Sequence, residues 1–340
     1  MTTLHQSTRD LRSSEADRND YAGLYWSSPP RRKPATANAH GREMTRCNNN
    51  TSFLSSLVSN PRSPKPLAAF LSRLVEDRDE RDRSHLFYCD GVRFVHHAAT
   101  SRHVHPRLFV YAPELSRRHP GVQSTMDRIR ERHPTVPLFP LPAEMLSRLS
   151  QSPEPQGIGA VVEQTWTPLY RLPPDAGLCY VALDTVQNPG NFGTILRTLE
   201  AVGGAGLICL PPAEPDAPDV DPFAPNVIRA GMGSTFALRF ARTGGTEWQS
   251  WREKHGVRLV GTSPHTGADF RSVRYGERVV VWMGGERKGL TDEQMARCDQ
   301  LVRIPMAPTA TADSLNLAMA TSILLYELFT QRGQGTGSRG

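Results

Sequence analysis

Residues 302–329 read VRIPMAPTATADSLNLAMATSILLYELF, a short β-like run followed by a loop and by the most apolar helical stretch of the chain. We expect Asp313 or Ser314 to cap this helix, because a side-chain oxygen there can accept a free N–H of the first turn. Two apolar stripes run along the helix, whereas a surface helix needs only one. The stripes are Leu317, Ala320, Leu324 and Leu328, and Leu315, Met319, Ser322, Tyr326 and Phe329. The helix is therefore predicted to pack against its own sheet and against a second subunit.

The loop before this helix is polar and ends at a helix N-terminus. The free N–H groups and the positive end of the helix dipole favour an anionic ligand group at such a place. Taken alone, the pattern is more simply that of an ordinary strand, loop and helix. The rest of the chain has to decide between the two interpretations.

The composition favours a reducing, intracellular compartment. The five cysteines lie far apart and include no CxxC pair, so neither a disulfide framework nor a zinc site is indicated. The chain has no run of about 18 apolar residues, which argues against a membrane-spanning helix. Its N-terminus lacks the apolar core of a signal peptide. We therefore expect a cytoplasmic protein with no membrane partner and no metal.

The net charge of +6 is unevenly distributed. Residues 1–66 hold ten Lys or Arg and five Asp or Glu, so this segment alone carries +5. Total charge is an argument about non-specific partners and does not identify a fold. The basicity by itself therefore does not predict an RNA-binding domain.

Shifts in composition divide the chain into five segments. Residues 1–64 are rich in Ser, Asn, Arg and Pro and are interpreted as a disordered basic tail. Residues 65–165 alternate helical and extended patterns, which predicts a small α/β module. A Pro-containing linker at 166–177 leads to a second α/β module at 178–330. Residues 331–340 are expected to form a second disordered tail.

Two features of the first module have plain interpretations. The charged run at 76–83 is most simply a solvated helix end and turn. His96, His97, His103 and His105 are close in sequence, but a metal site needs a closed constellation of ligands. We expect these histidines to belong to a basic surface or to ordinary packing.

In the second module, strand-like runs alternate with helical ones, which predicts a mainly parallel sheet. The GGAG run at 203–206 follows a helix and is interpreted as a helix stop, because a phosphate-binding loop would precede the helix. Three polar stretches lie at predicted strand ends, where parallel sheets hold their ligands. They are NPGNFGTILR at 188–197, MGGERKGL at 283–290 and the loop at 304–316.

In this order and spacing, the three stretches resemble the signature motifs of the SpoU/TrmH-type RNA 2'-O-methyltransferases of the SPOUT superfamily. The family motifs NPxNxGxxxR, GxExxGL, and IPM followed by SLN stand here as NPGNFGTILR, GGERKGL, and IPM with SLN. The resemblance covers residues 178–330. It extends more faintly to the first module, which looks like the substrate-binding domain of ribosomal-RNA members.

The resemblance implies a trefoil-knotted SPOUT methyltransferase domain with a mainly parallel sheet, preceded by a small α/β, L30e-like RNA-binding domain. It also implies an obligate homodimer with S-adenosylmethionine as the cofactor. By motif position, the implied cofactor-binding residues are Thr262, Gly284, Ile304 and Leu315. The implied catalytic residues are Arg197, Asn191, Glu286, Ser314 and Asn316. In family members the arginine works beside the cofactor of the partner subunit.

The predicted function is transfer of a methyl group from S-adenosylmethionine to a ribose 2'-hydroxyl of RNA, most simply large-subunit ribosomal RNA of the 23S type. Transfer RNA is the competing substrate, although relatives directed at transfer RNA often have only short extensions around the knot. A non-catalytic RNA-binding or ribosome-assembly protein is the alternative of another class. It rests on the loop at 307–313, which is about two residues longer than the family loop and lacks its glycine.

Overall fold

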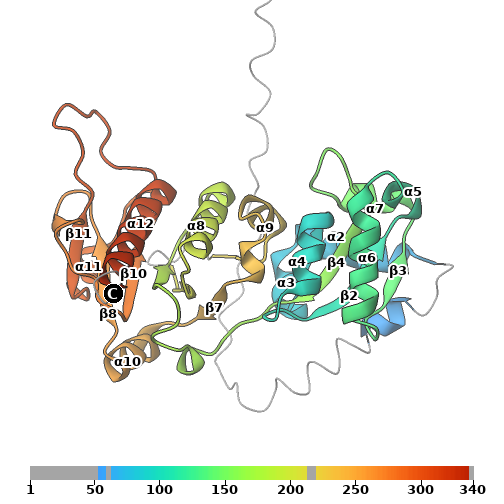
Figure 1. Ribbon diagram of the computed structural model, residues 1–340, viewed down its shortest axis with the longest axis horizontal. Coiled ribbons are helices and arrows are strands. Elements are labelled where there is room, and N and C mark those ends of the chain that lie inside the picture. Colours follow the sequence, from blue (N-terminus) through green and yellow to red (C-terminus); the bar gives the residue numbers. More distant parts are fainter. Residues whose placement is uncertain (1–52, 59–62, 213–219, 337–340) are drawn as a thin grey trace, which may run out of the picture. The chain divides into compact units, whose positions relative to one another are not determined.

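The computed structural model describes residues 53–58, 63–212 and 220–336 (Figure 1). Residues 1–52, 59–62 and 337–340 of the expected tails lie outside the described residues. Residues 53–58 were predicted to be disordered, but they form a helical turn whose Leu54 is buried. That part of the prediction is wrong, because the Phe53 ring packs edge-on against Phe70 with ring centres 5.2 Å apart.

The first module is built on a four-stranded sheet in the order β1-β4-β2-β3. Strand β4 is antiparallel to both β1 and β2, and β3 is parallel to β2. The strands are β1 (Leu86–Asp90), β2 (Pro106–Tyr111), β3 (Leu138–Pro140) and β4 (Ile158–Glu163). The helices are α2 (Lys65–Glu76), α3 (Arg78–Ser84), α4 (Val92–Thr100), α5 (Pro113–Ser116), α6 (Pro120–Arg132) and α7 (Ala143–Leu149).

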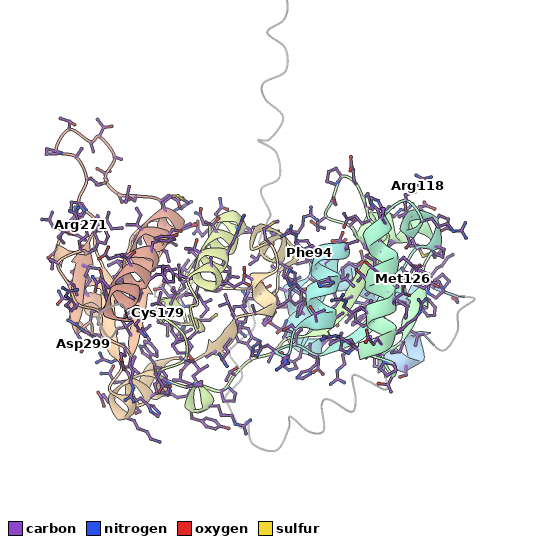
Figure 2. All side chains as sticks on the ribbon, in the orientation of Figure 1. Phe94, Arg118, Met126, Cys179, Arg271 and Asp299 are labelled. Carbon is purple, nitrogen blue, oxygen red and sulfur yellow. The ribbon has the colours of Figure 1, made fainter. Side chains whose placement is uncertain are left out.

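Alternation along these strands sends side chains to two faces of the sheet. Helix α2 covers one face with the apolar row that its 3.6-residue period predicts, ending in Leu71 and Leu74. Phe94 of α4 and Met126 of α6 belong to the core on the other face (Figure 2). The core on the face of α4 and α6 also includes residues of the following sheet. The limits of this module therefore stay a prediction.

The second sheet has seven strands in the order β7-β6-β5-β10-β8-β11-β9, and all of its described pairings are parallel. The mainly parallel α/β fold is thereby confirmed. The strands are β5 (Tyr180–Leu183), β6 (Gly206–Cys209), β7 (Arg239–Arg242), β8 (Arg258–Thr262), β9 (Ala268–Asp269), β10 (Val279–Met283) and β11 (Gln300–Arg303). The helical segments are η1 (Leu169–Arg171), α8 (Pro189–Ala201), α9 (Pro225–Ala230), η2 (Ser234–Phe236), α10 (Gly245–His255), α11 (Asp292–Ala296) and α12 (Leu317–Thr336).

Helices cover both faces of this sheet, so its central strands are apolar throughout. In β10, Val281 and Met283 face the core shared with α8 and α12, whereas Trp282 faces the core shared with α10. Helices α8 and α12 lie side by side (Figure 1). Helix α8 ends at the predicted stop, where Gly203 adopts a φ of +73°.

Helix α12 has a buried apolar side and an exposed one, its packing against a second subunit stays a prediction, and its predicted cap is wrong. Leu324 and Leu328 are buried, whereas Met319 and Tyr326 are 50% and 62% exposed. Residues 313–316 stay outside the helix, so neither Asp313 nor Ser314 caps it. Asn316 does so instead, with its Oδ1 accepting from the backbone N–H of Ala318 at 2.9 Å and of Met319 at 3.3 Å. The helix runs on to Thr336, into the segment predicted to be a disordered tail.

The charged run at 76–83 is only partly solvated: α2 ends there and four of its side chains are exposed, but Glu80 and Arg81 are buried. Most of it forms α3, and the Arg81 side chain is only 6% exposed. Its guanidinium donates to Asp221 Oδ2 at 2.7 Å and 3.3 Å and to the carbonyl oxygens of Leu74 and Val75. A partner 140 residues away cannot be read from a local charge pattern. This buried ion pair ties α3 to the segment that leads into α9.

Among the described residues, no helix is both long and apolar enough to cross a membrane.

We expect Arg81→Met to lower the free energy of unfolding by about 3 kcal/mol, because it leaves the Asp221 carboxylate buried without its partner. Urea denaturation checks this value. Arg148→Met is the control, since Arg148 forms a surface pair with Glu144 in which both side chains are 77% exposed. Equal stability of the two variants would contradict a structural role for the Arg81 pair.

Candidate active site

Four loops converge at the carboxyl edge of the parallel sheet. They follow β5, β8, β10 and β11, and these strands are neighbours in the sheet order. The carboxyl ends of parallel strands share one edge, which is where such sheets hold ligands. The three motif stretches of the sequence are therefore brought together by topology.

The loop after β5 is held by Asn188, the N-cap of α8. Its Oδ1 accepts from the backbone N–H of Gly190 at 2.7 Å and of Asn191 at 3.3 Å. This is the side-chain to backbone bonding that the sequence predicts for an Asn at a turn. The first turn of α8 is thereby fixed, and Asn191 is presented toward the loop after β10.

Glu286 is the centre of a hydrogen-bond network that joins three loops. Its Oε1 accepts from Asn191 Nδ2 at 2.5 Å, and its Oε2 accepts from the backbone N–H of Gln187 at 3.2 Å and of Asn188 at 3.3 Å. The Oδ1 of Asn191 in turn accepts from Asn316 Nδ2 at 3.2 Å. Three of the five predicted catalytic residues thus form one connected chain. An ionised carboxylate suits this position because it only accepts hydrogen bonds.

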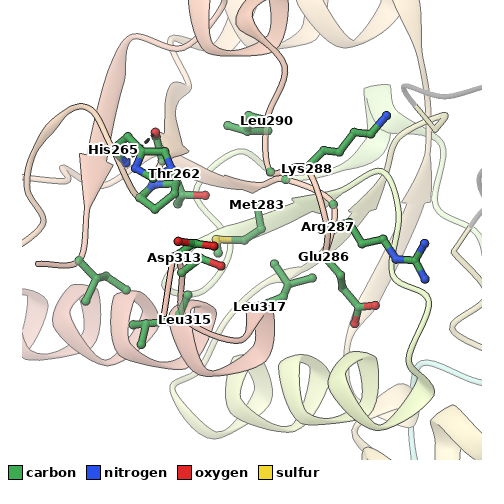
Figure 3. A pocket seen from close by; sticks show the side chains of 18 of the residues that line it. Thr262, His265, Met283, Glu286, Arg287, Lys288, Leu290, Asp313, Leu315 and Leu317 are labelled. Atoms are coloured by element: carbon green, nitrogen blue, oxygen red, sulfur yellow. Dashed lines mark hydrogen bonds between the residues drawn. The ribbon is translucent and has the colours of Figure 1, made fainter. Parts of the chain in front are cut away.

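Beside this network lies a pocket with a volume of about 360 Å³ (Figure 3). All four predicted cofactor-binding residues line it, namely Thr262, Gly284, Ile304 and Leu315. Glu286 and Ser314 line it as well. Its apolar wall includes Met283, Leu290, Val302, Leu317 and Leu324. The pocket therefore offers an apolar slot with polar groups at its rim, which suits a ligand with a flat apolar part and polar ends.

The loop after β10 closes tightly on itself. The N–H of Gly285 donates to the carbonyl of Gly289 at 3.2 Å, and the reverse bond measures 2.9 Å. A Cβ at Gly284 would collide with the backbone of Gly289 and Leu290. Glycine at this position is therefore required for the turn that forms one side of the pocket.

Arg197 stands apart from the pocket of its own chain. It lies on α8, its side chain is exposed, and it does not line the pocket. Asn191 and Asn316 also lie outside the lining and reach it only through Glu286. The structure thus gathers the cofactor residues around one cavity and leaves the predicted catalytic arginine on a nearby helix surface.

Several polar residues of the pocket were missed as ligand candidates, among them His265 and Asp313. His265, in the loop after β8, lines the pocket (Figure 3). Asp313, which was predicted only as a helix cap, lines it as well. Both are polar residues in loops that follow strands of the sheet. Position after a predicted strand was the signal that could have found them.

Asp184 is a buried carboxylate at the end of β5, only 3% exposed. Its Oδ2 accepts from Gln294 Nε2 at 2.8 Å, whereas its Oδ1 has no hydrogen-bond partner among the described residues. Burial raises the pKa of this carboxyl group, and the bond from Gln294 offsets part of the effect. Gln294 also closes the capping box of α11 with Thr291. Asp184 therefore ties the end of β5 to the helix that follows the pocket loop.

Comparisons with known proteins point to one family. The model of the SpoU rRNA Methylase family matches residues 179–326. The chain is 33% identical over 199 residues to a 23S rRNA (uridine(2479)-2'-O)-methyltransferase of Streptomyces viridochromogenes, covering 56% of this chain and 67% of that protein.

Two crystal structures of bacterial methyltransferases with bound AdoMet are similar to this fold. One is an rRNA methyltransferase from Sinorhizobium meliloti, with a TM-score of 0.65 and 32% identity over 77% of this chain and 94% of that one. The other is the SpoU methyltransferase AviRb from Streptomyces viridochromogenes, with a TM-score of 0.66 and 27% identity over 78% of this chain and 97% of that one.

We expect Asp184→Asn to raise the melting temperature at pH 7. The raised pKa means that Asp184 favours folding in its protonated form, so its contribution is fully present below the ordinary Asp pKa of about 4 and is lost as the pH rises through the folded-state value. The amide keeps an acceptor for Gln294 and carries no charge. Melting curves from pH 3.5 to 8 check the direction of this effect. If the difference in melting temperature between the variant and the wild type grew as the pH fell, it would contradict the expectation.

Proposed function

The chain belongs to the SpoU rRNA methylase family, and we propose that it transfers a methyl group from S-adenosylmethionine to a ribose 2'-hydroxyl of ribosomal RNA. The enzyme class and the cofactor follow from the family and from the AdoMet-bound neighbours. The observation that carries the proposal is the pocket at the carboxyl edge. It is lined by residues of the second and third motifs and braced by the first through Glu286.

The residues of the pocket fit S-adenosylmethionine. The apolar wall formed by residues such as Leu290 and Leu317 suits the adenine ring, and the glycine turn at Gly284 lets backbone groups approach it. Thr262 and Asp313 offer oxygen acceptors at the rim for hydroxyl or ammonium groups. Once bound, the cofactor supplies an activated sulfonium methyl group.

The lengthened loop leaves this pocket open. Residues 307–312 are exposed, and none of them lines the pocket, whereas Asp313 and Ser314 at its end do. The added residues therefore lie outside the space that the adenine needs. This favours a cofactor-binding enzyme over a non-catalytic RNA-binding protein.

Arg197 is the proposed catalytic residue of the site. An arginine side chain stays protonated at all physiological pH values, so it serves the reaction as a cation. We assign it to holding the phosphate next to the reacting ribose and to stabilising negative charge on the 2'-oxygen as its proton leaves to phosphate or water. Asn191 and Asn316 hold the loops, and Glu286 fixes them as a carboxylate.

Because Arg197 lies outside the pocket of its own chain, we propose that it acts beside the cofactor of a partner subunit in a homodimer. The exposed apolar stripe of α12 supports this arrangement. Met319, Tyr326 and Phe329 of α12 are each at least 47% exposed, and Leu315 just before the helix is 38% exposed, which is unusual for large apolar side chains so close together. We also propose the trefoil knot, an RNA-binding domain at 65–165 that a linker at 166–177 joins to the catalytic domain, and a cytoplasmic location.

Ribosomal RNA is favoured over transfer RNA because of the first module. Its four-stranded sheet and the helices around it make a folded unit of about 100 residues before the parallel sheet. The 23S-directed relative is similar to 56% of this chain. Transfer RNA remains the alternative substrate.

We expect Arg197→Ala to lower the kcat for methyl transfer to unmodified large-subunit RNA by about 100-fold or more. Label from methyl-labelled S-adenosylmethionine, counted in separate pools of ribosomal and transfer RNA, checks this. Cofactor binding should be unchanged in the variant, with the same rise in melting temperature on adding the cofactor. If only transfer RNA is labelled, the proposal that ribosomal RNA is the substrate is wrong. If neither pool is labelled and the cofactor does not raise the melting temperature, a non-catalytic RNA-binding protein is favoured.

We expect Met319→Glu to shift the protein from dimer to monomer, because it places a charge in the apolar stripe. Sedimentation velocity checks the mass, and Asp292→Lys on exposed α11 is the surface control. Mixing Arg197→Ala with Gly284→Val, whose pocket turn is blocked, should restore activity if the arginine serves the partner's cofactor. If the mixture is inactive, the arginine serves the pocket of its own chain, and the proposal that it serves the partner's cofactor is wrong.

A further inference from the structure

A cluster of cations lies on the first module where α4 meets α6. Burial lowers the pKa of His96, and so do the positive charges of Arg128, His97 and Arg132, with no carboxylate opposing them. Arg128 and Arg132 are exposed and form no ion pair among the described residues. They are four residues apart and so lie on the same face of α6. The cluster is a patch of uncompensated positive charge.

The cluster is joined directly to the helical turn η2 of the second module. The His97 ring stacks on Phe236, with ring centres 6.2 Å apart and planes 7° apart. Ser101 Oγ donates to the carbonyl of Phe236 at 2.6 Å. Gly233 also touches His97, since a Cβ on it would lie 2.9 Å from His97 Cδ2. The cation patch therefore borders the segment between α9 and η2.

The same segment reaches the proposed catalytic arginine. A Cβ on Gly193 of α8 would collide with Ala230 and Gly231, so α8 and the end of α9 are in close contact. Arg197 is one turn further along α8, on the side of the helix that carries Gly193. Residues 230–233 thus contact α8, the helix of Arg197, at one end and His97 of α4 at the other.

Met232 occupies the middle of this connection. It is one of two non-glycine residues with positive φ in the described chain, at +54°, and its side chain is 36% exposed. A bulky residue in the left-handed region costs free energy, and such strain gathers at functional sites. The flanking Gly231 and Gly233 leave its flexible, polarizable side chain without bulky sequence neighbours. Such a thioether makes favourable contacts with aromatic rings.

We infer that one strand of the substrate RNA runs from Arg197 over Met232 to Arg128 and Arg132 beside His96, with phosphates on the arginines and a base against Met232. This inference rests on the proposed function and assigns the surface that holds RNA next to the reacting ribose. Cations without carboxylate partners fit a phosphate backbone. An exposed apolar contact between two such sites fits an unstacked base. An acidic protein segment would use the cations but leave Met232 without a role.

The first test compares single charge reversals on α6. Arg128→Glu and Arg132→Glu should each weaken binding of an unmodified large-subunit RNA fragment about ten-fold at low salt, and each should reduce the salt slope by about 0.7. Arg130→Glu is the matched control. It lies on the opposite face of α6 and is paired with Asp127 at 2.9 Å. The three variants should show the same thermal shift with S-adenosylmethionine.

The second test separates a binding role from a structural role for Met232. Glycine accepts a φ of +54° without strain, so Met232→Gly should keep or raise the melting temperature. If a base contacts the side chain, the same variant should raise the KM for RNA several-fold and leave cofactor binding unchanged. An unchanged KM for RNA would overturn the role of Met232.

The outcomes distinguish this inference from the proposed function. If the wild-type enzyme methylates ribosomal RNA but Arg128→Glu and Arg132→Glu bind it as tightly as Arg130→Glu does, the surface is wrong and the function stands. If the wild-type enzyme binds the fragment through this surface and transfers no methyl group, the proposed function fails and the surface stands. Equal weakening by all three reversals would show only a general charge effect and would overturn the surface.

Discussion

The carboxylate of Glu286 is the constraint on which the geometry of the site depends. It accepts two backbone N–H groups and the amide of Asn191, and Asn191 in turn accepts from Asn316. Three loops are thereby held against one another, and Asn191 of the first loop lies 95 residues before Glu286 and 125 residues before Asn316. The parallel sheet makes this possible, because it brings the carboxyl ends of β5, β10 and β11 to one edge. Without the carboxylate, the loop amides would have to find other acceptors, and the pocket beside them would lose one wall.

A second constraint joins the two modules. The Arg81–Asp221 pair is largely removed from solvent, so the cost of desolvating two charges is offset by several hydrogen bonds around the guanidinium. Phe87 of β1 stacks against Phe223 nearby, with ring centres 5.1 Å apart. The apolar core likewise continues from one sheet to the other. These contacts give a physical reason for the cation cluster of α4 and α6 to keep a defined position beside the catalytic domain.

Helix α12 connects the site to assembly. One side buries Leu324 and Leu328 against the sheet, and its start is capped by Asn316, which also belongs to the Glu286 network. The opposite side leaves Met319 and Tyr326 in solvent. One helix therefore contacts the pocket loop and also carries the surface on which a second subunit is proposed to pack.

The sequence by itself determined the features that depend on local pattern. Alternating strand and helix patterns predicted the parallel α/β fold, and apolar periodicity predicted that α12 has two apolar sides. The resemblance to the SpoU/TrmH family implied which residues surround the pocket, from Thr262 to Leu315. Only the tertiary structure decided partners that are distant along the chain. Arg81 looked solvated because Asp221 is 140 residues away. Asn316 caps α12 in place of Asp313 because residues 313–316 stay outside the helix, where Asp313 and Ser314 line the pocket. Periodicity reports which side of an element is buried, whereas a hydrogen bond or ion pair between distant residues exists only once the fold has brought them together.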